Sequence, residues 1–125
     1  MHWWPSWPIS RGATAEKILQ GMIADTPEPP CYAVIFTSVR NPVESDDYAK
    51  AAARMLELAV DQPGFLGLES ARDGGTGISV SCWRSRQDIA ARRQNIEHRE
   101  ARRQANRWYK AYRIRICRVE KACGS

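Results

Sequence analysis

The stretch PGFLGLESARDGGTGISVSCW, residues 63–83, reads as a β-hairpin that ends at a tryptophan. Its turn residues divide it into two strands, Phe65–Arg72 and Ile78–Trp83. The intervening DGGTG contains consecutive glycines, Gly74 and Gly75, which supply the positive φ angles that a tight reversal needs. We therefore predict two antiparallel strands joined by a glycine turn.

A strand and an amphipathic helix precede this hairpin. CYAVIFTSV, residues 31–39, is rich in β-branched and aromatic residues and predicts a strand. Ser45 is a suitable N-cap for a helix over about residues 46–61, which QPG ends. Apolar residues at i, i+3, i+4 and i+7 spacing give this helix a buried stripe: Tyr48, Ala51, Ala52, Met55, Leu56 and Ala59.

A second helix and a last strand follow the hairpin. We expect the helix to run from about Ser85 to Asn106. Residues 109–119 then alternate in the manner of a strand, with Tyr112, Ile114 and Ile116 between Arg113, Arg115 and Cys117. The order is β-α-β-β-α-β, which predicts an α+β, ferredoxin-like fold with an antiparallel sheet. Because helices cover only one face of such a sheet, we expect the other face to pair in a homodimer.

Composition predicts one globular domain. The chain has 125 residues, of which 43% are hydrophobic and 26% charged. No apolar run approaches the roughly 20 residues of a membrane helix, and MHWWPSWP lacks the features of a signal peptide. We therefore expect a cytoplasmic protein without a membrane partner.

The amino-terminal residues differ from the rest. We interpret residues 1–30 as a Trp/Pro-rich extension and linker, and residues 31–122 as the folded domain. The first 21 residues are either dispensable or an arm whose tryptophans dock on the partner subunit, and we favour the first interpretation.

The cysteines and glycines predict neither a metal nor a cofactor. No C-x-x-C pair occurs among Cys31, Cys82, Cys117 and Cys123, and no histidine lies at ligand spacing from them. The GTG of the tight turn is not a dinucleotide fingerprint.

Positive charge is concentrated at the carboxyl end. Residues 84–125 carry 13 basic and 4 acidic side chains, within a net charge of +5 for the chain. This distribution suits nucleic acid, an anionic small molecule or a partner's acidic surface. RNA-recognition motifs share the β-α-β-β-α-β order, but GISVSCW lacks their aromatic pattern, so we expect no nucleic-acid partner.

The sequence resembles the antibiotic biosynthesis monooxygenase domain family, whose fold is a dimeric α+β barrel. The resemblance spans about residues 31–122 and is carried by YAVIFTSVRN, LELAVDQPGFLGLESARD, GISVSCWRSRQDI, IEH and RWYKAYRIRICRVEKA. Members include cofactor-free oxygenases that convert phenolic polyketides or quinols to quinones, and others that degrade haem. Many members have no known activity, so the resemblance implies the fold more strongly than the reaction.

Two departures from the family pattern bear on function. Haem-degrading members carry a catalytic asparagine within the first strand, whereas Asn41 lies beyond its end, which argues against haem degradation. A tryptophan found in the second helix of many relatives is Arg92 here, so the pocket is either more polar or simply different.

The resemblance implies two catalytic candidates, each with an alternative interpretation. His98 would be the general base for a phenol, or a surface histidine, because it lies about 180° from Ile89 on the expected helix. Trp83 would wall a pocket for a flat aromatic substrate and donate its indole N–H, or anchor the core.

Four further candidates could contact the substrate. Tyr109 and Tyr112 either hydrogen-bond a substrate oxygen or close the end of the barrel, and we favour the second. Asn95 could donate to an oxyanion or be a solvated helix residue. Arg113 lies on a face of the last strand that could meet an anionic ligand or the partner subunit. Six arginines surround the expected second helix rather than line one stripe of it, and we expect them to be solvated and partly salt-bridged: Arg92, Arg93, Arg99, Arg102, Arg103 and Arg107.

The resulting hypothesis is a cofactor-independent monooxygenase that oxidises an electron-rich aromatic compound with O2. The compound would be a phenol, a quinol or a polyketide-like ring system. The alternative is a non-catalytic dimeric module of the same fold, for ligand binding or stress response.

Overall fold

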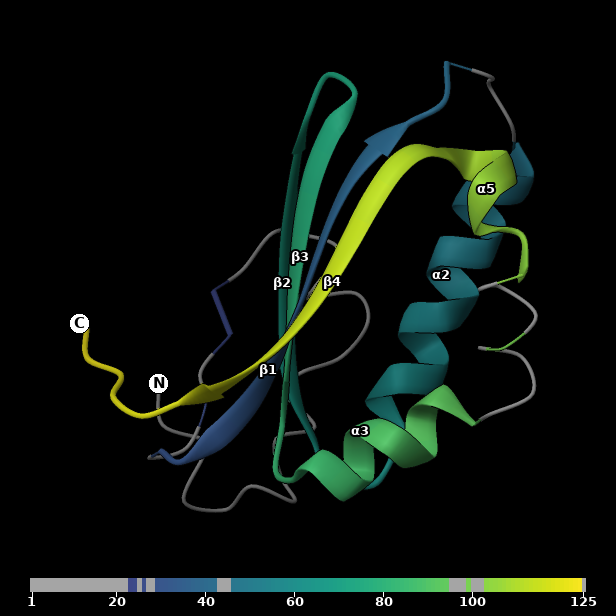
Figure 1. Ribbon diagram of the computed structural model, residues 1–125. Coiled ribbons are helices and arrows are strands. Elements are labelled where there is room, and N and C mark those ends of the chain that lie inside the picture. Colours follow the sequence, from purple (N-terminus) through teal and green to yellow (C-terminus); the bar gives the residue numbers. More distant parts are fainter. Residues whose placement is uncertain are drawn as a thin grey trace.

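The computed structural model describes residues 29–42, 46–94 and 103–124, together with Ile23, Ala24, Thr26 and Arg99. The elements are β1 (Cys31–Arg40), α2 (Asp46–Val60), β2 (Phe65–Asp73), β3 (Thr76–Trp83), α3 (Arg86–Arg93), α5 (Ala105–Trp108) and β4 (Tyr109–Val119). The predicted ferredoxin-like α+β fold is confirmed (Figure 1). Most of the predicted extension, and the predicted cap Ser45, lie outside the described residues.

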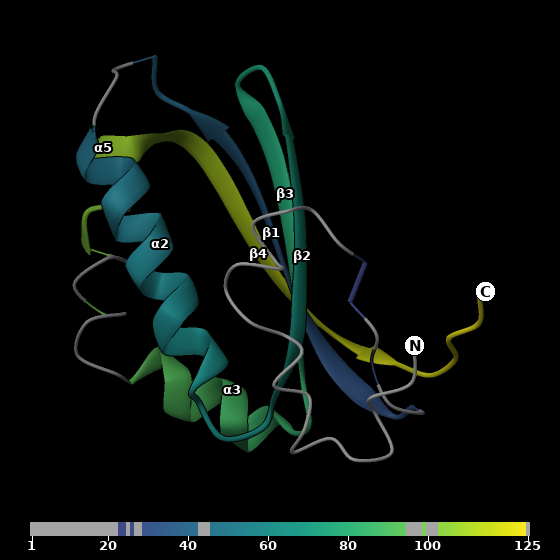
Figure 2. The same ribbon diagram turned by 180° about the vertical axis from the view of Figure 1, so that it is seen from behind.

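The four strands form one antiparallel sheet in the order β2-β3-β1-β4. Figures 1 and 2 show the helices on one face of this sheet. We call that face the inner face and the opposite one the outer face. Val34 of β1 pairs with Ser81 of β3 and Ile116 of β4, so these three side chains share the inner face.

The register also assigns residues to the outer face. Ile35, next to Val34, pairs with Val80 and Arg115, which therefore share the outer face. The main-chain N–H of Ala24 donates to a carboxylate oxygen of Glu69 at 3.1 Å, so this residue lies against the outer side of β2.

Two glycines fix the turns around β2. Gly64 has φ +83 and lies against the Asp88 side chain, where a Cβ would clash. Gly74 has φ +62 in the β2–β3 turn and has open space around it. Because L-residues avoid positive φ, glycine suits both positions.

Two buried clusters form the core of the described residues, and the smaller one, Cys31 and Leu66, packs against Cys82 and Val119 on the outer face. The larger cluster lies between the inner face and the helices. Its buried residues come from α2, β2, β3 and α3: Leu56, Ala59, Phe65, Trp83 and Ile89. Trp83 is only 1% exposed. Burial of these large apolar groups is the main force that holds the helices to the sheet.

The predicted continuous helix from Ser85 to Asn106 is wrong. Ser85 does begin α3, since its Oγ accepts from the main-chain N–H of Asp88 at 3.1 Å. However, α3 ends at Arg93 with Gln94 as its C-cap, and α5 is a separate helix that begins at Ala105. Short helices depend on packing of an apolar face, and Ile89 is the one buried residue of α3. Because Ile89 and His98 are not on one continuous helix, the expected 180° between them does not indicate where His98 points.

None of the helices in the described part of the chain is both long enough and apolar enough to cross a membrane.

Candidate functional site

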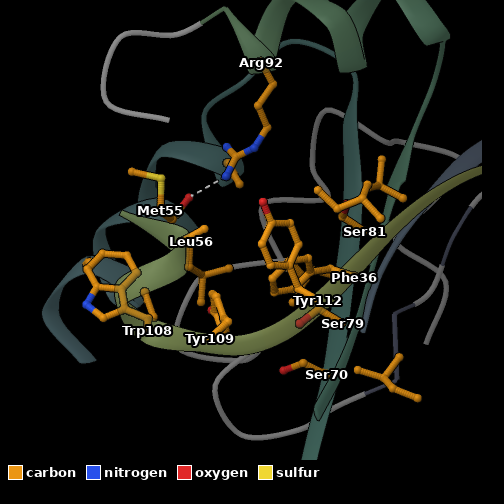
Figure 3. Close-up of a pocket in the computed structure, with 18 of the residues that line it drawn as sticks. Phe36, Met55, Leu56, Ser70, Ser79, Ser81, Arg92, Trp108, Tyr109 and Tyr112 are labelled. Carbon is orange, nitrogen blue, oxygen red and sulfur yellow. Dashed lines mark hydrogen bonds between the residues drawn. The ribbon is translucent and has the colours of Figure 1, made fainter. Parts of the chain in front are cut away.

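A cavity of about 1110 Å³ lies between the inner face of the sheet and the helices (Figure 3). Ligand cavities in proteins commonly measure about 300–1,000 Å³, so this one has room for a molecule of several rings. The sheet contributes apolar side chains and small hydroxyls, among them Phe36, Ser70, Ser79 and Ser81. The α2 helix contributes a row of alanines with Met55 and Leu56.

The cavity is open to solvent along the edge strand β4. Three inward-facing residues of this strand line the cavity yet stay exposed: Tyr112 at 45%, Ile114 at 37% and Ile116 at 50%. Exposed apolar side chains in a row beside a cavity are typical of a binding site for an apolar ligand. We call this side the β4 opening.

Aromatic side chains gather at one end of the cavity. Phe36 lies 5.2 Å from the Tyr109 ring and 5.8 Å from the Tyr112 ring, between centroids. Tyr48 meets Trp108 edge-on at 5.7 Å. Such edge contacts stabilise the packing and create a surface on which a flat ring can lie.

A tyrosine pair adds a polar element to this aromatic end. Tyr109 Oη donates to Tyr48 Oη at 3.1 Å, and the Arg40 guanidinium lies 3.4 Å from the centroid of the Tyr48 ring. Burial, with a smaller effect from this hydrogen bond, raises the pKa of Tyr109 well above its usual value. Tyr109 is therefore a neutral hydroxyl at physiological pH.

Arg92 reaches into the cavity from α3 (Figure 3). Its Nη2 donates to the main-chain oxygen of Met55 on α2 at 3.1 Å, and its Cζ lies 5.8 Å from the centroid of the Trp83 ring. Burial lowers the pKa of Arg92 to about 10, which still leaves it protonated at neutral pH.

Among the residues that the structure describes, the charged ones around the cavity are all positive. Among the described residues that line it there are five arginines and no aspartate or glutamate: Arg72, Arg92, Arg93, Arg99 and Arg103. Arg72 is held by bonds from its guanidinium to Ser38 Oγ at 2.6 Å and to the Gly75 carbonyl at 2.8 Å. A concave surface with charges of one sign attracts a ligand of the opposite sign.

The structure brings three of the predicted site residues to the cavity and separates a fourth. Trp83, Tyr109 and Tyr112 all line it. Arg113 pairs with Thr37 on the outer face, so any role in ligand binding would belong to that side of the sheet. His98 and Asn95 lie outside the described residues, and their roles remain predictions.

The charge pattern predicted a solvated Arg92, whereas the resemblance put it at a pocket position, and the structure agrees with the second of these expectations. The signal was its spacing: Arg92 lies three residues after the buried Ile89, so the two share one face of α3. That face packs toward α2 and the sheet, which directs the guanidinium inward.

Comparison with known proteins shows the family to which this chain belongs. The sequence model of the family described as "Antibiotic biosynthesis monooxygenase" matches residues 31–104. The uncharacterized protein YqjZ of Bacillus subtilis is 44% identical over 106 residues, which cover 82% of this chain and 91% of that protein.

Solved structures share the fold at low sequence identity. SnoaB, a cofactor-independent oxygenase from Streptomyces nogalater, superposes with a TM-score of 0.66 at 8% identity, over 78% of this chain and all of SnoaB. Rv0793 from Mycobacterium tuberculosis superposes with a TM-score of 0.63 at 14% identity, over 76% of this chain and 98% of its own.

Proposed function

Because the chain belongs to the antibiotic biosynthesis monooxygenase family, we propose that it is a cofactor-independent monooxygenase of electron-rich aromatic compounds. Its substrates would be phenols, quinols or polyketide-like ring systems, and its oxidant O2. The observation that carries the proposal is the cavity under α2 and α3. It combines the size for several rings, an aromatic end and a positive lining.

The reaction requires little from the protein besides binding and proton transfer. Loss of a proton from the substrate gives an anion, which passes one electron to O2. The substrate radical and superoxide combine to form a C–O bond, and protonation gives a hydroperoxide. Loss of water from the hydroperoxide leaves a quinone carbonyl, so one oxygen atom enters the product and the other leaves as water.

The described residues suit the substrate-binding step of this reaction. A flat ring would enter through the β4 opening and lie against Phe36 and Tyr112. Positive charge from arginines on the cavity lining stabilises the substrate anion, which lowers the barrier to its formation. His98 remains the proposed general base, because a histidine titrates near the pH at which the reaction must run.

We also propose that the protein functions as a homodimer that pairs through the outer face. In the described residues the helices cover only the inner face. The outer face presents apolar Ile35 and Val80 beside Arg113 and Arg115, a mixture that suits an interface between two copies.

The proposed activity is tested by oxygen consumption. Purified protein is incubated with a panel of anthrones and quinols, and we expect one O2 consumed per quinone formed with a matching substrate. Ser79→Phe, which fills the cavity from the sheet side, should reduce the rate by about a hundredfold. The matched control Ala91→Phe adds the same ring to an exposed position of α3 and should leave the rate unchanged.

The same experiment can overturn the proposal. Oxygen uptake no faster than the uncatalysed rate for every compound, together with tight binding of some of them, would establish the non-catalytic ligand-binding alternative. Equal rates for the Ser79→Phe variant and the unmodified protein would place the reaction outside this cavity.

A further inference from the structure

We infer that the ligand of the cavity is an aromatic carboxylate, and that Arg92 binds its carboxylate group. This inference names a substrate class for the proposed function and rests on it only for the choice of cavity. The ring of the ligand would lie toward the aromatic end, and its carboxylate would meet the guanidinium that descends from α3 (Figure 3).

The first argument is the fixed position of Arg92. One hydrogen bond to the Met55 carbonyl, at 3.1 Å, and the Trp83 ring at 5.8 Å hold the guanidinium between α2, α3 and the sheet. A side chain held in place by the protein loses less conformational entropy when it binds a ligand. A solvated surface arginine would have neither contact.

The second argument is the number of donors left over. A guanidinium carries five N–H groups in a planar fork. Within the described residues, only one hydrogen bond from Arg92 is made, to Met55. The free donors include adjacent N–H groups, which fit the two oxygens of a carboxylate in a bidentate pair.

The third argument is charge. No carboxylate of the described residues lies within salt-bridge distance of Arg92, and the described lining of the cavity holds arginines without an acidic residue. Burial already disfavours the charged form of this side chain, as its lowered pKa shows. A partly buried cation that has no carboxylate among its described neighbours gains more from an incoming anion than a solvated one does.

A structural role alone would give a different result. Arg92 joins α3 to α2, so its loss could loosen the helices without any effect on ligand choice. The ratio of the affinities for an anion and for its neutral isostere distinguishes a binding role of Arg92 from a structural one. A loosened cavity would weaken the binding of both ligands alike and leave this ratio unchanged.

The test uses two probes that the proposed reaction cannot oxidise. Calorimetric titration compares 2-naphthoate with 2-naphthamide, which has nearly the same shape without the charge. We expect the full-length protein to prefer the carboxylate by about 10- to 100-fold, the range for hydrogen bonds to a charged group. Arg92→Met should abolish the preference, and Arg92→Lys should retain part of it, since lysine keeps the charge without the fork.

The control is Arg86→Met on the same helix. Arg86 is exposed, lies 5.4 Å from the Tyr32 ring and does not line the cavity, so its loss should preserve the preference. Equal affinity of the unmodified protein for both probes, or no binding of 2-naphthoate, overturns the inference. So does a preference that survives Arg92→Met or disappears in Arg86→Met.

Failure of this inference and failure of the proposed function are distinguishable. An Arg92-dependent preference without oxygen uptake by any aromatic supports the carboxylate site and removes the oxygenase activity. Oxygen uptake that is equally fast with carboxylated and neutral quinols, in both the unmodified protein and Arg92→Met, supports the oxygenase activity and removes the carboxylate site.

Discussion

The indole Nε1 of Trp83 donates a hydrogen bond to Ser81 Oγ, 3.0 Å away on the same strand. The ring also meets Phe65 edge-on, with 5.5 Å between centroids. Trp83 is thus a core residue whose N–H is already satisfied within the protein. Its predicted role as a wall of the substrate site remains a prediction, but a bond from its indole to a substrate would require this contact to break.

Loss of the Trp83 ring should destabilise the fold. Trp83→Ala removes a buried ring, and we expect a loss of about 3–5 kcal/mol in the free energy of unfolding, measured by urea denaturation. Ser81→Ala leaves the indole N–H without a partner and should cost about 1 kcal/mol. In a Trp83→Phe background the cost of Ser81→Ala should nearly vanish. If Ser81→Ala costs the same free energy of unfolding in both backgrounds, the hydrogen bond between Trp83 and Ser81 does not stabilise the fold.

Gly64 should tolerate alanine less well than Gly74 does. Both have positive φ, so either substitution incurs backbone strain of about 1–2 kcal/mol. Only at Gly64 would the new methyl group also clash with the Asp88 side chain, next to the cap of α3. We expect a larger fall in the urea midpoint for Gly64→Ala than for Gly74→Ala. Equal midpoints would show that Asp88 moves aside at no cost.

Tyr109 should make the protein sensitive to alkaline pH. Its pKa is raised in the folded state, so the unfolded chain loses the phenolic proton first as pH rises. The stability linked to Tyr109 is complete below a pH of about 10 and is lost progressively above it. Tyr109→Phe should flatten this decline in urea midpoints measured across the alkaline range. An unchanged decline in the variant would assign it to other groups.

If His98 is the general base, quinol oxidation should fall as pH drops through about 6.5, because the protonated imidazole cannot accept a proton. His98→Ala should remove this limb of the pH profile together with most of the rate. His2→Ala, which replaces the other histidine of the chain, serves as the control and should keep the limb. A full rate and an unchanged profile in His98→Ala would eliminate this residue from the mechanism.

The proposed dimer should appear in light scattering as twice the 14.2 kDa of one chain at micromolar concentration. Ile35→Lys places a charge on the outer face and should shift the mass to that of one chain. Ile116→Lys places the same charge on the inner face, beside the β4 opening, and should leave the dimer intact. A mass of 14.2 kDa for the unmodified protein would rule out the dimer.

The strands were predictable because their signals are local. Alternation in residues 109–119 and the glycine pair at Gly74 predicted β4 and the hairpin to within a few residues. The break after Arg93 was not predictable in this way. Residues 85–106 contain neither glycine nor proline, and whether such a helix continues depends on an apolar surface to pack against.

The cavity itself could not be derived from the sequence. Its lining comes from every described helix and strand, so its volume depends on how far α2 and α3 stand from the sheet. Tyr109 and Tyr112 were recognised as a pair, since they lie together at the start of β4. The position of Arg92 follows from helix geometry rather than from its charge. It lies three residues after the buried Ile89 and therefore shares the buried face of α3.

The outer face and the β4 opening lie on different sides of the same sheet. This arrangement determines whether the two copies of a dimer would bind ligand independently. Pairing through the outer face would leave the β4 opening of each copy uncovered. Each chain would then take up one ligand without influence from the other. A dimer of this kind would show a stoichiometry of one ligand per chain and no cooperativity, because the β4 opening of each copy lies away from the surface that joins them.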